Sequence, residues 1–276
     1  MMKKIIVTGC SHSAGVERSD SIIFKDYEGF LEKSKKMDQH SKHLQRLTHQ
    51  INFLLKITNN KKFHKRIVQD VEKTGKIATR YFRLLNRSLS WPARLQQQLP
   101  KNKVINFAKG GSSFKMSVYN TLKFCSQSTD RFIAIHQVPT HTRNYFKFGS
   151  LRYEVTSMGN LEFKEKLFKN NNSEEKLLEE AKEKYKNLIR RDVQFEYFKK
   201  SIKRYLACLE KHSTDKIENY FILEDDTQKE LFPNRNILID NFEIFRQKYR
   251  IGADGHVVDE NFQKDLVELV ISKISL

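Results

Sequence analysis

The sequence KKIIVTGCSHS, residues 3–13, places a short apolar run directly before a turn of small residues. Ile5, Ile6 and Val7 are β-branched and Gly9 ends the run, which is typical of a strand buried on both faces. The turn that follows carries two serines and a histidine. Because ligands of parallel α/β sheets bind beyond the carboxyl ends of the strands, this turn is a candidate site.

Four further short apolar segments repeat the strand pattern along the chain: 103–108, 131–138, 219–225 and 236–240. Helical patterns lie between and after them, from Pro92 to about Pro100, from Ser112 to about 126, around Phe195 to Leu209, and over about 259–274. Asp259 is the expected cap of the last helix. Strands that alternate with helices predict an α/β fold, with a parallel sheet covered on both faces.

A basic helical segment interrupts this alternation after the first strand. Leu44, Leu47, Ile51 and Leu54 recur at helical spacing and predict a helix within 28–57. A second helix follows, with an apolar face that runs from Ile67 to Leu85. The chain is therefore expected to form one domain, residues 1–276, with a helical hairpin inserted at 28–89.

The segment between the third and fourth strands is predicted as a small hairpin followed by a long helix. LRYEV (151–155) and LEFKEKLF (161–168) are the two expected strands of the hairpin. Ser173, followed by Glu174 and Glu175, suits the start of the long helix, because acidic residues favour the positive end of the helix dipole.

The net charge of +18 is concentrated in the helical segment, where residues 31–90 hold fifteen Lys and Arg against four Asp and Glu. One interpretation is a polyanionic partner that binds residues 31–90, such as nucleic acid or an anionic glycan. The other is a solvated lysine-rich surface. Tyr81 and Phe82 fall on the apolar helix face and are expected in the core.

Cysteine content and hydropathy bear on the cellular compartment of the protein and on whether it binds a metal. The three cysteines show no metal-ligand spacing, so neither a disulfide framework nor a metal site is expected. Apolar runs stay well short of the ~20 residues of a membrane span. The apolar stretch at the N-terminus is also too short for a signal peptide, and a cytoplasmic protein is predicted.

Three predicted turns carry residues suited to acyl-transfer chemistry. Ser11 follows the first strand, where a serine at a tight turn can be a nucleophile with backbone N–H groups nearby. Gly111 follows the second strand, where glycine lets a backbone N–H approach a substrate. His256 lies just before the last helix and can act as general base, with Asp254 to orient it.

The order of these three blocks resembles the SGNH (GDSL-like) hydrolase family, in a variant found in phage and bacterial genomes. VTGCSHSAG matches the nucleophile block with Ser11, and VINFAKGGSS matches the second block with Asn106 and Gly111. GADGHVVDENFQKDLVEL matches the last block with Asp254 and His256. Ser-Trp-Pro at 90–92 also fits the variant. The resemblance spans the whole chain in outline and about thirty residues closely.

This resemblance implies a flavodoxin-like three-layer α/β/α sandwich with a five-stranded parallel sheet. It also implies a serine hydrolase that deacylates a small ester, with O-acetyl groups on a carbohydrate as one substrate class, and that needs no cofactor or metal. Ser11, Asp254 and His256 would form the catalytic triad. Ser11, Gly111 and Gln137 would form the oxyanion hole, and Asn106 and His12 would contact substrate, although Asn106 can instead brace its own turn.

The third family block is where the sequence departs from the pattern. The family has Asn directly after the third strand, whereas this chain has AIHQVPTHTRN. Gln137 can supply the missing side-chain donor, with His136, Thr140 and His141 as rivals. The Asp–His spacing is one residue shorter than the common form, and Val257 replaces the usual Pro.

Two alternatives compete with the hydrolase interpretation. A catalytically degenerate member of the family would bind an anionic polymer through its basic insertion. Alternatively, IIVTGCSHSAG resembles the strand–loop–helix opening of sulfotransferases, where a serine and backbone N–H groups bind a nucleotide phosphate. That opening lacks the Gly-Lys-Ser/Thr of a standard phosphate loop, and it leaves Gly111 and His256 without a role.

Overall fold

The computed structural model describes residues 3–9, 13, 15, 19–57, 62, 65–66, 69, 76–109, 112–140, 144–148, 151–155, 191–213, 216–252 and 256–276. Within these ranges the main sheet has five parallel strands in the order β2-β1-β3-β6-β7. Their bounds are Lys4–Thr8 (β1), Val104–Asn106 (β2), Phe132–Gln137 (β3), Ile217–Ile222 (β6) and Asn236–Ile239 (β7). In chain order the parallel strands are arranged 2-1-3-4-5, one of the two common orders of doubly wound sheets.

The two faces of the sheet bury different side chains, because successive residues of a strand point to opposite sides. Ile5 and Val7 of β1 pack with Ile133 and Ile135 of β3 in one core cluster. Ile6, between them in β1, packs on the other side with residues of β3. The continuous apolar run at the start of the chain is thus explained by burial on both faces.

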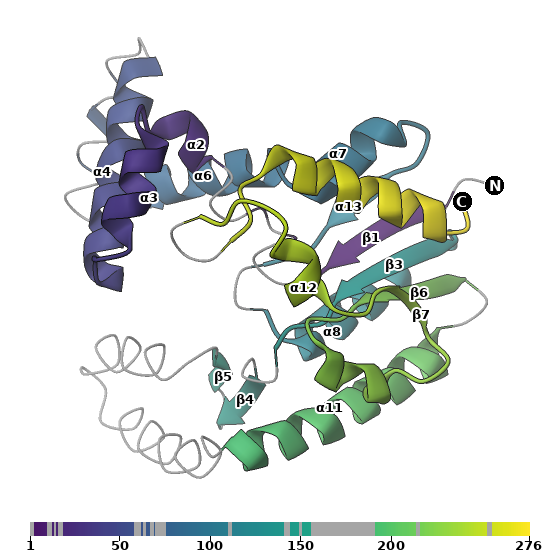
Figure 1. Ribbon diagram of the computed structural model, residues 1–276. Coiled ribbons are helices and arrows are strands. Elements are labelled where there is room, and N and C mark those ends of the chain that lie inside the picture. The colour runs from purple at the N-terminus through teal and green to yellow at the C-terminus, as the bar shows by residue number, and fades with distance from the viewer. Residues whose placement is uncertain are drawn as a thin grey trace.

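Helices cover both faces and complete an α/β sandwich (Figure 1). α7 (Trp91–Gln98) and α13 (Glu260–Lys273) pack together over one face, where their apolar residues share a cluster with the strands. α8 (Phe114–Cys125) and α11 (Arg191–His212) pack together over the other. The prediction of a five-stranded parallel sheet with helices on both faces is confirmed.

Shorter elements lie at the end of the chain. The 3₁₀ segment η1 (Asp226–Leu231) follows β6, and α12 (Phe242–Arg246) follows β7. Asp259 caps α13 as predicted, because its side chain accepts a hydrogen bond from the Asn261 N–H at 2.9 Å. In the part of the chain that the structure describes, no helix is long and apolar enough to span a membrane.

The helical insertion contains more elements than the predicted hairpin. Its helices in the described residues are α2 (Asp20–Ile23), α3 (Tyr27–Ser34), α4 (Gln39–Ile57) and α6 (Lys76–Ser88). The predicted helix over 28–57 is wrong in its continuity, since it is interrupted between α3 and α4. Asp38 explains the break, because its carboxylate accepts hydrogen bonds from the N–H and hydroxyl of Ser41 and starts a new helix.

The helices of the insertion lie beside the sheet (Figure 1) and share an apolar core of their own. Phe24, Phe30, Leu54 and Phe82, from three of its helices and the α2–α3 turn, are buried together. A buried ion pair between Asp20 and Arg46, at 2.7 Å, ties α2 to α4. α2 and the turn after it, which precede the predicted start of the insertion at residue 28, also contribute to this core.

One strand of the hairpin predicted after the third strand is present, and its described partner is a segment that was not predicted as a strand. LRYEV forms β5 (Leu151–Val155), but its antiparallel partner is β4 (Asn144–Phe148), with Phe148 opposite Leu151. LEFKEKLF and the helix expected after Ser173 lie outside the described residues.

Candidate functional site

The candidate site is at the carboxyl edge of the sheet, where β1 and β3 end side by side. Thr8 pairs with His136 as the last residue of β1, and Gln137 is the last residue of β3. In this strand order β1 and β3 flank the switch point of the sheet, where connections leave in opposite directions and ligands bind. Gly9 and Gln137 lie at this position.

Gly9 is required where it stands. Its φ of +145° is a conformation that other residues rarely adopt. A Cβ built on Gly9 would lie 2.6 Å from the Cβ of Gln137. The chain leaving β1 therefore passes directly against the residue that the sequence nominated as the third oxyanion donor.

A buried hydrogen-bond chain fixes the amide of Gln137. The Trp91 indole donates from Nε1 to the Ser13 hydroxyl at 3.2 Å, and that hydroxyl donates to Gln137 Oε1 at 2.7 Å. The indole is only a donor, so the hydroxyl has its own hydrogen left for the glutamine oxygen. The Gln137 NH₂ group must then face away from Ser13.

This arrangement leaves a buried donor without a partner among the described residues. Gln137 is only 1 % exposed, and its Nε2 makes no hydrogen bond to any described residue. A buried donor without a partner is costly, and native proteins keep few of them. The amide NH₂ of Gln137 is thus held ready to bind an acceptor at the carboxyl edge of the sheet.

His136, a rival of Gln137 in the sequence, lies on the opposite face of the sheet. Its Nδ1 is 3.0 Å from the Thr8 hydroxyl and its Nε2 is 3.1 Å from Asn219 Oδ1. The Asn219 amide donates to Ser213, so its oxygen accepts from Nε2–H. Burial lowers the pKa of His136 to about 4, and the ring is neutral at pH 7. With both ring nitrogens paired inside the core, His136 is not placed to contact a ligand beside Gly9.

Asn106 at the end of β2 holds two turns together. Its Nδ2 donates to the backbone oxygen of Ser13 at 2.9 Å, and its Oδ1 accepts from the N–H of Ala108 at 2.9 Å. Both polar atoms of the side chain are therefore used within the fold. This geometry favours the bracing role over the substrate-binding role that the sequence also allowed.

The segment that carries His256 is held at its base by backbone hydrogen bonds. The Gly252 N–H donates to the His256 oxygen at 2.7 Å, and the Val258 N–H donates to the Arg250 oxygen at 3.1 Å. Ile251 and Val257 pair between them as an antiparallel bridge. The backbone of His256 is thus fixed directly before α13, and its side chain is half-buried.

Four of the predicted site residues lie outside the described residues: Ser11, His12, Gly111 and Asp254. His141, the other histidine rival for the third donor, lies outside them too. The structure does describe their neighbours, which are Gly9 and Ser13 in the first block and Gly252 and His256 in the last.

Sequence reasoning missed the part of the site that the insertion supplies. Arg87, in the last turn of α6, donates from Nη2 to the Ala108 oxygen at 3.2 Å. Its buried Nε has no hydrogen-bond partner among the described residues. Beside it, Asn86 Oδ1 accepts from the Ser19 N–H, and a Cβ on Gly15 would meet the Asn86 oxygen. The one sequence signal for the contact between Arg87 and Ala108 is the position of Arg87 shortly before Ser-Trp-Pro.

Metal ligands and reactive thiols do not gather at this edge in the described part of the chain. No group of three or more His, Cys, Asp or Glu side chains that could hold a metal occurs among the described residues. Cys125, on the opposite face, is buried, and burial raises the pKa of its thiol to about 11. A thiol with so high a pKa is a poor nucleophile at neutral pH.

No protein-family model matches the chain, and neither a curated protein nor a solved structure is significantly similar to it. Function therefore has to be argued from the site itself.

Proposed function

We propose that the protein is a serine hydrolase of SGNH type that deacylates a small ester, with O-acetyl groups on a carbohydrate as the first substrate class to test. The strand order, the glycine turn after β1 and the histidine before the last helix support this proposal. The observation that carries it is the buried Gln137 NH₂ beside Gly9, which has no hydrogen-bond partner among the described residues. An oxyanion hole needs such a preorganised donor.

In the proposed mechanism, Ser11 attacks the ester carbonyl and His256 takes the proton of its hydroxyl. Asp254 accepts a hydrogen bond from the other ring nitrogen and keeps the imidazole in the productive tautomer. The alcohol leaves with the proton from His256, and an acyl group remains on Ser11. Water activated by His256 then releases the acid and restores the serine.

The oxyanion formed in each step is stabilised by three donors: the N–H groups of Ser11 and Gly111, and Nε2 of Gln137. Gln137 takes the place of the family asparagine because its longer side chain is anchored by Ser13 through Oε1. The anchor limits the rotation of the amide, so its donor is aimed before substrate arrives. Preorganised donors cost no reorganisation at the moment of reaction.

The experiment that tests the proposal measures p-nitrophenyl acetate hydrolysis by the wild type, Ser11→Ala and His256→Ala, each with a circular-dichroism spectrum to confirm folding. The proposal expects activity in the wild type and its loss in both variants, with labelling of the wild type at Ser11 by a fluorophosphonate probe. Absence of both hydrolysis and labelling in the folded wild type would overturn it. The degenerate, binding-only alternative would then be favoured.

A further inference from the structure

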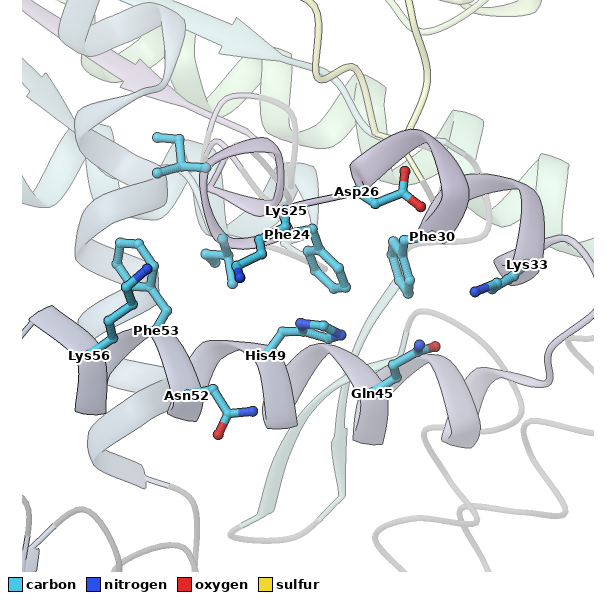
Figure 2. Close-up of a pocket in the computed structure, with 12 residues that line it drawn as sticks. Phe24, Lys25, Asp26, Phe30, Lys33, Gln45, His49, Asn52, Phe53 and Lys56 are labelled. Carbon is cyan, nitrogen blue, oxygen red and sulfur yellow. The ribbon is translucent and has the colours of Figure 1, made fainter.

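The helical insertion contains a pocket that the proposed hydrolase chemistry does not use. It has a volume of about 580 Å³ and lies between α4 on one side and the α2–α3 segment on the other. In Figure 2, Phe24 and Phe30 lie on one side of the gap, opposite His49 and Gln45 of α4. One face of α4 supplies residues 45, 49, 52, 53 and 56, which follow helical spacing. A pocket of this size fits a small ligand or one unit of a polymer.

Three lysines surround the pocket, each from a different part of the chain. Lys25 comes from the turn after α2, Lys33 from α3 and Lys56 from the last turn of α4. None of their ammonium groups makes an ion pair or hydrogen bond with another described residue. The only acidic side chain in the lining, Asp26, caps α3 by accepting a hydrogen bond from Gly29. The pocket is therefore positive and suits an anion.

The interior of the pocket is aromatic. Phe24 stacks on Phe30 with ring centroids 4.1 Å apart, and His49 lies against Phe24 at 4.3 Å. Phe53 lines the pocket near Lys56 (Figure 2). Aromatic side chains of this kind stack on flat rings, and purely aliphatic ligands would not need them.

Amide groups complete the lining. Gln45 and Asn52 of α4 both belong to the lining, and Gln45 lies across the gap from Phe30 (Figure 2). The Oε1 atom of Gln45 is buried and has no hydrogen-bond partner among the described residues. An acceptor in this state fits a ligand that brings its own N–H or O–H donor. The pocket thus combines anion-binding lysines, stacking rings and hydrogen-bonding amides.

We infer that this pocket binds one nucleotide of a single-stranded nucleic acid, with the base against the aromatic side chains and its phosphates on Lys25, Lys33 and Lys56. The base would supply the donor that Gln45 lacks. The excess of basic residues over 31–90 continues beyond a single nucleotide, which favours a strand over a free mononucleotide. This inference does not depend on ester hydrolysis, because none of these residues belongs to the proposed triad or oxyanion hole.

The test measures fluorescence anisotropy of a fluorescein-labelled oligodeoxythymidine of about 12 nucleotides against the full-length protein. Lys33→Gln and Lys56→Gln should each weaken binding about fivefold at about 0.1 M salt, and each should reduce the slope of log K against log salt by about 0.7. Phe53→Leu keeps an apolar side chain but removes the ring, and should weaken binding at least about fivefold.

The matched control is Lys36→Gln, which removes one charge from the exposed turn after α3 but not from the pocket lining. It should change the dissociation constant less than about twofold. Equal losses of affinity in Lys36→Gln and Lys33→Gln, together with unchanged binding in Phe53→Leu, would overturn the pocket proposal in favour of general polyanion binding.

A second experiment adds unlabelled AMP or heparin as competitor. Stronger binding of AMP than of the strand would assign a mononucleotide site, and displacement by heparin with no loss in Phe53→Leu would assign a glycan-type surface; both overturn the inference.

Discussion

The last two residues of β3 place two buried polar side chains on opposite faces of the sheet. His136 has both ring nitrogens hydrogen-bonded and lies among Phe114 and Phe221 in the core. Gln137 has only its oxygen paired, and its NH₂ group is buried without a described partner. Both side chains are almost inaccessible to water, so burial alone does not distinguish a structural group from a functional one. The difference lies in which hydrogen-bonding atoms the fold has already used.

The largest expected effect comes from removing the unpaired donor. Gln137→Met keeps the length of the side chain but removes the amide, so the rate constant kcat for ester hydrolysis should fall about 10²–10³-fold while the folded population remains. The measurement is steady-state hydrolysis of p-nitrophenyl acetate, normalised to the fraction of protein labelled by a fluorophosphonate.

Gln228 provides the matched control for that substitution. Its Nε2 donates to the Pro139 oxygen and its Oε1 accepts from the Glu224 N–H, both at 2.9 Å, so both atoms of its amide are hydrogen-bonded within the fold. Gln228→Met should lower the free energy of unfolding by about 1–3 kcal/mol and leave kcat of the folded enzyme unchanged. Equal losses of kcat in Gln137→Met and Gln228→Met would contradict the distinction between a functional and a structural glutamine.

His136 should make stability depend on pH. Its pKa is about 4 in the folded protein and about 6.5 when exposed. Between these values the unfolded chain binds a proton that the folded protein does not, so the free energy of unfolding falls as pH drops from about 6.5 to about 4. The contribution of this one group is at most about 1.4 kcal/mol per pH unit.

Urea unfolding at pH 7, 5.5 and 4.5 checks this expectation in the wild type and in His136→Gln, which cannot titrate. The difference in unfolding free energy between the two proteins should shrink as the pH falls. If the difference in unfolding free energy stays constant from pH 7 to 4.5, His136 is not the group that makes stability depend on pH.

Gly9→Ala tests the close contact between the two strand ends. The new methyl group would meet Gln137, and the backbone would be forced into a φ that alanine rarely adopts. A strained residue of this kind costs about 1–3 kcal/mol, and the displaced Gln137 should also lower kcat. Thermal unfolding and p-nitrophenyl acetate kinetics measure the two effects. Unchanged kcat in a destabilised variant would show that Gln137 keeps its position without this contact.

Trp91→Phe should have the smallest effect. It retains an aromatic ring in the core but removes the Nε1–H that donates to Ser13. The Ser13 hydroxyl can still donate to Gln137, so we expect a loss of about 1 kcal/mol in stability and a change of less than about tenfold in kcat. A loss as large as that of Gln137→Met would mean that the indole, through Ser13, is essential for holding the amide.

Local sequence patterns predicted the scaffold better than the site. The five strands were predicted from short apolar runs, and the cap of α13 was predicted from Asp259 at the helix start. Both signals lie within a few neighbouring residues of the chain. The break between α3 and α4 was missed, although Asp38 is a recognisable helix-capping residue. The apolar spacing within α4 suggested one continuous helix instead. The β4–β5 pairing was missed although Gly149-Ser150 was present as a turn signal.

The hydrogen bonds of the site could not be read from such patterns. Ser13 and Gln137 are 124 positions apart, and Ser13 and Trp91 are 78 apart. The family resemblance nominated Gln137 as a donor, but only the three-dimensional arrangement says that its oxygen is occupied and its NH₂ is not. The contact of Arg87 with Ala108 depends likewise on how the insertion packs against the sheet.

The segment before α13 belongs to both halves of the molecule. Val257 is buried in the core under the sheet, whereas its neighbour Val258 is buried in the core of the insertion. Arg250, at the base of the same segment, donates to Glu28 of α3. Excision of the insertion would therefore remove the packing from one side of the segment that carries His256. The two cores therefore meet at adjacent residues, and a change in either one bears on the segment that carries His256.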